Sequence, residues 1–466
     1  MQGLIGPLKE LAEFEELCKN KKKDVGMIRV CGCVNSQKSH MMYALGDGCK
    51  YKVIACSSET KAKQIYEEYR FLDSNTYLYP AKDFLFYQAD IRSKELVKQR
   101  MEGIQAVLSG EPVTVVTSLD GFMDHLAPKE SIAEKVLKIQ NDSVLKLDEM
   151  AEKLSVIGYD REVQVEGPGQ FAVRGGILDI YPLTEELPVR IELWGDEVDS
   201  IRTFDVESQR SIENLMDIVI YPAVEFPQNG EKGVSFLDYF PPEDTILFLD
   251  EPVRLVERGQ NIEDEFMEAQ KKRLESGYDL EEEEAKIFPV TEILKKINCY
   301  SSIGFYALGM KCKGLEVRES YEIQAKSVNP YNNSFEMLTQ DLKRLKRNGY
   351  RVILLSGSRT RAKRLAEDLR DYNLSSYYSE DLDREVKPGE IMTAYGYIAE
   401  GYEYPMLKFT VIAESDIFGK RKKKKKRKRG QWYEKHETHC STRSVCCFGS
   451  NCPGRMRKLF FHIYKH

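Results

Sequence analysis

Two stretches, GQFAVRGGILDIYP at residues 169–182 and PVRIELWGDEVDSIRTFD at residues 188–205, decide the fold at the centre of this chain. In the first, Phe171–Arg174 and Ile177–Tyr181 are short β-rich runs separated by Gly175-Gly176. Both glycines tolerate positive φ, so the pattern predicts a β-hairpin.

In the second stretch, apolar side chains alternate with polar or aromatic ones from Val189 to Trp194. One strand face can therefore enter a core while the other presents Arg190, Glu192 and Trp194. Gly195-Asp196 then turns the chain into a further run, Glu197–Phe204. Residues 158–210 are predicted to form a small antiparallel sheet whose polar face carries both signs of charge.

The composition is that of a soluble globular protein, with 466 residues, enough for about three domains, of which 42% are hydrophobic and 31% charged. The N-terminal sequence has no secretory-signal pattern, and no apolar run approaches the roughly 20 residues of a membrane helix. Seven of the eleven cysteines are scattered before residue 313 and four lie in the last 27 residues, which indicates reduced thiols. We therefore expect a cytoplasmic protein with no membrane partner.

Charge is distributed unevenly along the chain, whose formal net charge is −6. Residues 420–429 are all Lys or Arg and contribute +10, and residues 430–466 contribute +4, so the first 419 residues carry −20. Phosphate contacts need clustered Lys and Arg, so this acidic body argues against a broad nucleic-acid-binding surface. A protein is the better expected partner.

The segment GCVNSQKS, residues 32–39, resembles a phosphate-binding loop. It matches the pattern G-x-x-x-x-G-K-[ST] at Gly32, Lys38 and Ser39, but Gln37 replaces the second glycine. That glycine normally lets the backbone approach the phosphates without a Cβ. We interpret the segment as a strand–loop–helix unit that keeps the fold without the ligand, with a nucleotide site as the alternative.

Strand-like and helical runs alternate through the first 120 residues. Strands are predicted at 27–30, 51–55, 76–79 and 113–117, and helices at 7–20, 60–69 and 93–108. Such alternation is typical of a parallel, doubly wound α/β sheet.

The same pattern resumes beyond Pro222, where residues 245–252 (TILFLDEP) are predicted to form a strand that ends at Asp250-Glu251. Many nucleotide hydrolases place a magnesium-binding carboxylate at such a strand end. Together with the segment 32–39, Asp250 indicates a P-loop-like domain whose motor is disabled and which is split by the antiparallel insertion.

The rest of the body is also predicted to be α/β. A long helix is expected over 254–284 and short strands over 300–325. A further α/β domain is expected with helices at 334–346 and 359–371 and strands at 351–355, 391–397 and 408–414. It contains no recognisable catalytic constellation.

Four motifs together resemble a known family: the two stretches above, YPAKDFLFYQADIRSKELVKQR at residues 79–100, and ESDIFG at residues 414–419. They are similar to the N-terminal part of bacterial transcription-repair coupling factor, whose first three domains are similar to the excision-repair subunit UvrB. The resemblance covers residues 1 to about 419. It implies a UvrA-binding domain at 128–222, inserted between the halves 1–127 and 223–325 of one α/β domain, then a domain at 326–417 and a tail at 418–466.

The resemblance also implies which residues contact UvrA. By motif alignment, Arg161, Arg174, Arg190 and Glu192 fall where the matching UvrB domain presents polar residues to UvrA. Arginine suits such a surface, because its planar fork pairs bidentately with carboxylates. The alternative is that these are ordinary solvated strand charges, which are common and weak.

Two departures from the family limit what the resemblance implies. The connection at 80–95 is short where UvrB has a long aromatic hairpin that verifies DNA damage, so damage verification is not expected here. ESDIFG is followed by neither the RNA-polymerase-binding domain nor the DNA translocase of the family, so the chain looks truncated. We therefore expect no cofactor for this chain, since ATP and magnesium act in the family's motor. RNA polymerase and DNA are expected partners only through the missing domains.

The tail differs in character from the body. Its basic run, 420–429, is expected to be a solvated, disordered linker, with nucleic-acid binding as the alternative. Several potential zinc ligands follow, but their spacing fits no known finger and we assign no metal site: His436, His439, Cys440, Cys446, Cys447 and Cys452. We hypothesise that a reading-frame slip in the lysine codons replaced the family's continuation.

Three functions follow as hypotheses. The first is a non-catalytic module that docks UvrA, recruits it to RNA polymerase stalled at DNA damage and, in the full-length family, holds the motor in check. The alternative is a nucleotide-dependent enzyme that uses Lys38, Ser39 and Asp250. The third is a nucleic-acid tether that acts through residues 420–429.

Overall fold

The computed structural model of the chain describes residues 2–82, 94–227, 230–277 and 287–419. The described residues belong to one compact unit. The predictions for the tail and for most of the connection at 80–95 therefore fall outside the described residues. Among the described helices, none has the length and apolar character that a membrane crossing requires.

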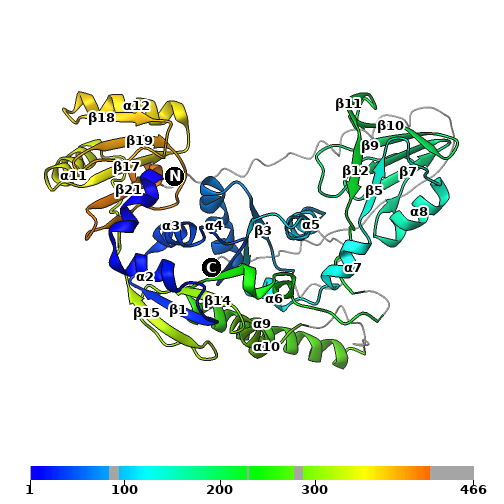
Figure 1. Cartoon of the computed structure of the whole chain (residues 1–466), viewed down its shortest axis with the longest axis horizontal. Helices are drawn as coiled ribbons and strands as arrows, with labels where there is room; N and C mark the ends of the chain where they lie inside the picture. The colour runs from blue at the N-terminus through cyan, green and yellow to red at the C-terminus, as the bar shows by residue number, and fades with distance from the viewer. Residues whose placement is uncertain (1, 83–93, 228–229, 278–286, 420–466) are drawn as a thin grey trace, which may run out of the picture. The chain divides into compact units, whose positions relative to one another are not determined.

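A seven-stranded sheet confirms the predicted parallel α/β class (Figure 1). Its strand order is β15-β1-β14-β13-β2-β4-β3, and every neighbouring pair is parallel. The strands are β1 (Gly26–Cys31), β2 (Tyr51–Cys56), β3 (Thr76–Tyr79), β4 (Val113–Ser118), β13 (Thr245–Asp250), β14 (Ser301–Phe305) and β15 (Val317–Glu322). The first four precede the antiparallel region in the sequence and the last three follow it, so this sheet draws on both sides of the insertion.

Helices cover both faces of the parallel sheet. One apolar cluster includes residues of α2 (Ala12–Asn20), α3 (Asn35–Leu45) and α4 (Glu59–Leu72). The other includes residues of α5 (Lys94–Leu108), α6 (Asp120–Met123), α9 (Pro252–Glu275) and α10 (Val290–Ile297). Burial on both faces explains why central strands such as β4 and β13 read as nearly continuous apolar runs rather than as alternating ones.

Two predicted helices differ from the observed ones. The helix predicted at 7–20 is divided into a 3-10 turn at Gly6–Glu10 and α2, because the backbone is extended at Leu11, and a short helix, α1 (Gln2–Ile5), precedes them. The helix predicted at 254–284 is α9, which ends at Glu275; the last part of that prediction, residues 278–284, lies outside the described residues.

The central region forms a six-stranded sheet in the order β11-β10-β9-β8-β7-β6. The strands are β6 (Asp160–Arg161), β7 (Gln170–Arg174), β8 (Ile177–Tyr181), β9 (Val189–Trp194), β10 (Glu197–Phe204) and β11 (Ser211–Leu215). All pairs are antiparallel except β6 with β7. The predicted hairpin is confirmed, and its first turn glycine, Gly175, has a φ of +59° that favours glycine.

Further elements complete this central region. The two-stranded sheet pairs β5 (Leu137–Gln140) with β12 (Asp217–Ile220), and α7 (Lys129–Glu134) precedes it. Ala151 and Leu154 of α8 (Leu147–Val156) lie in the same apolar cluster as the core-facing strand residues, and Figure 1 shows α8 beside β7.

A fourth sheet follows in the order β16-β20-β21-β17-β19-β18. Its strands are β16 (Lys326–Ser327), β17 (Arg351–Ser356), β18 (Ser376–Ser379), β19 (Ile391–Tyr395), β20 (Tyr402–Tyr404) and β21 (Phe409–Ala413), and its helices are α11 (Phe335–Arg347), α12 (Arg359–Asp371) and α13 (Glu414–Phe418). Pairs among β17, β18, β19 and β21 are parallel, and β20 and β16 add antiparallel pairs at one edge. The predicted second α/β region is therefore present.

Candidate functional site

The antiparallel sheet has an outer face, turned away from the apolar cluster that contains Phe171, Leu178, Ile180, Val189 and Ile191. Residues that alternate with these core positions carry most of the sheet's charge. We call this set the outer face; it consists of Ala172, Arg174, Asp179, Arg190, Glu192, Trp194 and Arg202.

Asp179 lies at the centre of the outer face and is fully buried although it belongs to the polar side of β8. The strand register places it between Ala172 of β7 and Arg190 of β9. Its carboxylate accepts hydrogen bonds from Arg190 Nε at 2.7 Å and Nη2 at 2.9 Å, and from Arg174 Nη2 at 2.5 Å. One buried acid therefore holds both arginines.

Arg190 lies on the predicted face but is largely covered, with 14% of its side chain exposed. Besides Asp179, it donates to the side chain of Gln209 at 2.8 Å and to the backbone carbonyl of Gln209 at 3.3 Å. Its guanidinium also lies 4.4 Å from the centre of the Phe204 ring. Hydrogen bonding to Asp179 outweighs burial and raises the pKa of Arg190. Most of its bonding capacity is used within the domain.

Arg174 is more accessible, with 44% of its side chain exposed. Its bond to Asp179 uses one of the five N–H donors of a guanidinium. Trp194 is 85% exposed, which is unusual for a tryptophan, and Glu192 is ion-paired with Arg202 of β10. The accessible part of the outer face thus combines an anchored arginine, an aromatic side chain and an acid–base pair.

Arg161 is exposed on β6 but does not share the outer face. Its register partner is Phe171, a core residue, whereas Arg174 is in phase with Ala172. Side chains of register partners lie on the same side of a sheet. The four arginine and glutamate positions predicted from the sequence therefore divide into three on one face and one at the sheet edge.

The segment 32–39 does not form a wide phosphate-binding loop. Helix α3 begins at Asn35, so that Gln37, Lys38 and Ser39 lie in its first turns rather than after an open loop. Gly32 has a φ of +79° and its Cα lies against the backbone of Ile323, where a Cβ would approach a carbonyl oxygen to 2.6 Å. The glycine is needed for this packing between neighbouring strand ends.

Lys38 and Asp250 are brought together, as their positions in a P-loop-like domain would require. Lys38 Nζ lies 2.8 Å from Asp250 Oδ1 and 2.5 Å from Glu251 Oε1, and its side chain is only 5% exposed. Burial opposes its charge, but the two carboxylates outweigh burial and raise the pKa of Lys38. Glu251 has a φ of +52° and also accepts from the Ala307 amide at 2.9 Å. The cation and the carboxylates satisfy one another.

Ser39, the third residue of the motif, is bonded to another side chain. Its hydroxyl donates to Glu68 of α4 at 2.5 Å, and Ser36 donates to the same carboxylate at 2.7 Å. The Ala399 amide also donates to Glu68, and the Glu400 amide donates to Ser36 Oγ, both at 3.1 Å. The segment just before β20 thus binds next to this motif.

Gln37, at the position of the missing glycine, donates to the Tyr404 hydroxyl at 3.1 Å. His40, one turn farther along α3, lies between that hydroxyl and the Leu4 carbonyl, 3.1 Å from the first through Nδ1 and 2.9 Å from the second through Nε2. Because a carbonyl only accepts, Nε2 carries the proton. Burial lowers the pKa of His40 to about 4, so it is neutral at neutral pH. The side chain that replaces the glycine joins this helix to β20.

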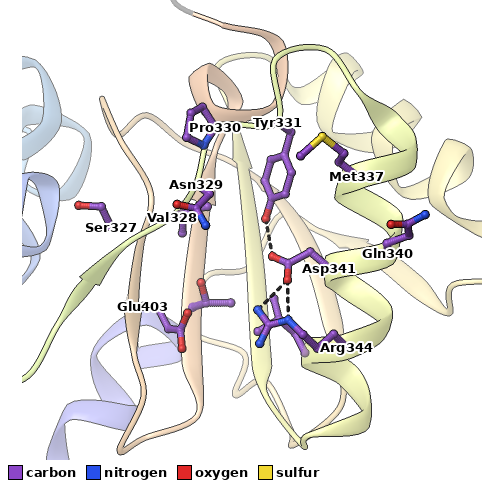
Figure 2. Close-up of a pocket in the computed structure, with 12 residues that line it drawn as sticks. Ser327, Val328, Asn329, Pro330, Tyr331, Met337, Gln340, Asp341, Arg344 and Glu403 are labelled. Carbon is purple, nitrogen blue, oxygen red and sulfur yellow. Dashed lines mark hydrogen bonds and ion pairs between the residues drawn. The ribbon is translucent and has the colours of Figure 1, made fainter.

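A separate surface pocket of about 380 Å³ lies between α11 and the edge formed by β16 and β20 (Figure 2). Figure 2 shows Asp341 accepting from the Tyr331 hydroxyl at 2.9 Å and from Arg344 Nε at 2.8 Å. Glu403 accepts from the Tyr350 hydroxyl at 2.8 Å. The charges that line this pocket are engaged with protein groups and point to no particular ligand.

Several residues of both sites were not predicted. Asp179 and Arg202 complete the outer face, and Glu68, Glu251 and Tyr404 complete the contacts around Lys38 and Ser39. For Asp179 a signal was present, since it is an acid between two apolar residues on a strand that pairs with Val189–Trp194. Within the described ranges, no group of His, Cys, Asp and Glu is arranged to hold a metal ion.

Comparison with known proteins finds a family model that is similar to the central region. A family model described as the UvrB interaction domain matches residues 137–226, which contain β5 to β12 and α8. The outer face therefore lies within the matched region.

Over more of its length, the chain is similar to curated proteins named transcription-repair-coupling factor. That of Bacillus subtilis (strain 168) is 26% identical over 91% of this chain and 41% of its own length. That of Staphylococcus haemolyticus is 25% identical over 75% of this chain and 34% of its own length. The chain thus spans well under half the length of these relatives.

Among solved structures, an ATP-dependent RNA helicase from Sulfolobus tokodaii, described as hypothetical, aligns over 84% of this chain and 82% of its own at 10% identity. Its TM-score of 0.25 is too low to inform the fold. The sequence relatives are the informative ones. With residues 137–226 matching the UvrB interaction domain and similarity over three quarters or more of its length, the chain is similar to part of the transcription-repair-coupling factors.

Proposed function

We propose that this chain is a non-catalytic docking module that binds UvrA through the outer face of its antiparallel sheet. In a complete coupling factor, such a module recruits UvrA to RNA polymerase that has stalled at DNA damage, with polymerase and DNA bound by other domains. The observation that carries the proposal is the position of the outer face inside the region that matches the UvrB interaction domain. The work of such a module is binding, and it needs no cofactor.

The chemistry of the outer face supports a protein partner. Arginine and tryptophan are enriched among the residues that dominate binding energy at interfaces. Arg174 is held in place by Asp179 while much of its side chain stays accessible, and Trp194 offers a large exposed aromatic surface. A guanidinium group that is already oriented loses less conformational entropy when it pairs with a carboxylate of the partner.

The site around Lys38 supports the non-catalytic part of the proposal. A bound nucleotide would need Lys38 for its phosphates and Asp250 for its magnesium ion, but these two side chains are bonded to each other. The bonds of Ser39 to Glu68 and of Gln37 to Tyr404 would also have to be broken. We propose that residues 32–39 and Asp250 have a structural role. We also propose that the docking module acts in the cytoplasm.

Replacing Arg174 with alanine tests the docking surface. We expect the Kd for UvrA, measured by calorimetric titration of the intact chain, to rise by about tenfold or more, since anchoring arginines cost at least about 1.4 kcal/mol when truncated. Arg347→Ala serves as the control, because Arg347 is exposed on α11 outside the matched region. Equal Kd values for the wild-type protein and the Arg174→Ala variant would remove Arg174 from the interface.

A further inference from the structure

We infer that Asp179 is the positioning residue of the UvrA-docking surface, and that it sets binding affinity by fixing the guanidinium of Arg174 through a shared carboxylate. The inference rests on the proposed function and deepens it. Asp179 itself has no exposed surface, so its effect on a partner must pass through the arginines that cover it.

The strand register makes this arrangement possible. Asp179 occupies the middle of β8, whose neighbours on either side are β7 and β9. Arg190 stands directly opposite it on β9, and Arg174 reaches it from the end of β7. Residues directly opposite each other lie about 5 Å apart and diagonal neighbours about 7–8 Å, so the long side chains of Arg190 and Arg174 can both reach the carboxylate.

The two arginines play different parts in this arrangement. Arg190 donates to Asp179 through Nε and Nη2, donates also to Gln209 and lies over the Phe204 ring. These contacts fix its guanidinium, which in turn holds the carboxylate of Asp179 in place. Arg174 contributes a single donor and remains 44% exposed. Asp179 is thus held by the first arginine and in turn orients the second.

Stability alone gives little reason for a buried carboxylate at this position. Replacing a buried ion pair by apolar residues of similar size is often neutral or stabilising, because taking charges out of water is costly. Ala172, directly opposite Asp179 on β7, is apolar and buried, so this face of the sheet accommodates apolar side chains. An ionised acid at this position gives the guanidinium group of Arg174 a defined orientation. A guanidinium that is already oriented is suited to bind an acidic side chain of the partner.

The test is a double-mutant cycle on the intact chain, with the Kd for UvrA as the readout. Asp179→Asn should raise the Kd by about tenfold in the wild-type background, but by less than about twofold when Arg174 is already alanine, because interacting residues are not additive. A merely structural role would weaken binding by the same factor in both backgrounds. Asp199→Asn, at an exposed position of β10, is the matched control and should leave the Kd unchanged.

A second variant guards against loss of the fold. Asp179→Glu keeps the charge but moves the carboxylate outward by one methylene, and we expect a folded protein, judged by its thermal transition, with a raised Kd for UvrA. Wild-type affinity in either Asp179 variant, or equal effects in both Arg174 backgrounds, would overturn the inference. Failure of the wild-type chain to bind UvrA would instead overturn the proposed function.

Discussion

Replacing Lys38 with methionine is expected to lower the free energy of unfolding by about 3–5 kcal/mol. The substitution keeps most of the side-chain volume but leaves Asp250, which is 2% exposed, and Glu251 without their shared cation. Breaking a buried ion pair by removing one partner costs this much, because the remaining charge stays buried and uncompensated. Chemical denaturation of the wild-type and variant chains measures the difference.

A matched control separates this effect from the loss of any lysine. Lys272 forms an ion pair with Glu268 on α9, but both side chains are about 70% exposed. Lys272→Met should therefore leave the unfolding transition where it is. If Lys38→Met were as stable as the control, the pair with Asp250 would not be structural, and saturable ATP binding by the wild-type chain would then favour the nucleotide-binding alternative.

Replacing Arg100 with methionine is expected to destabilise the protein by a similar amount, about 3–5 kcal/mol. Arg100 is fully buried on α5, where Nε donates to both carboxylate oxygens of Glu225 at 2.7 and 2.9 Å and Nη2 donates to Asp124 at 2.6 Å. It also donates to the Pro80 carbonyl at 2.8 Å. Glu225 follows the inserted sheet in the sequence, and Arg100 precedes it. Arg100 therefore links the segment after the insertion to the elements before it.

The pH dependence of this network has a defined sign. Burial opposes ionisation of Asp124, but Lys82 and Arg100 outweigh it and lower the pKa of Asp124. A lowered carboxyl pKa contributes stability that is present above the ordinary value of about 3.9 and is lost as the pH falls below it.

The midpoint denaturant concentration at pH 7 measures the effect of Arg100→Met on stability. Arg344→Met, at a side chain that is 56% exposed, is the control. Equal midpoints for the two variants would contradict the structural role of Arg100.

Local patterns predicted the elements of the fold well, because they depend on neighbouring residues. The glycine pair at 175–176, the alternation at Val189–Trp194 and the run Glu197–Phe204 correspond closely to β7 through β10. The helix at 7–20 was the least accurate, since the break at Leu11 reflects how the first residues pack on segments far away in the sequence, as in the bond from the Gly3 amide to the Leu382 carbonyl.

The partners of the site residues could not be predicted in the same way. Lys38 lies near Asp250 because strands β1 and β13 end at the same edge of the sheet. Whether the two side chains form an ion pair depends on which other groups lie at that edge. The contacts of Gln37 with Tyr404 and of Ser39 with Glu68 connect elements that only the tertiary fold brings together. The burial of Asp179 could not be predicted, because a lone acid in a strand usually indicates a solvated position.

Hydrogen exchange of the intact chain, with and without UvrA, tests the docking claim most directly. We predict that UvrA slows exchange of backbone amides in β7 through β10, residues 170–204, because binding stabilises the outer face against local opening. Exchange in β17 through β21, residues 351–413, should not change. Protection confined to residues 351–413 or to residues 32–40, with none in 170–204, would contradict the account.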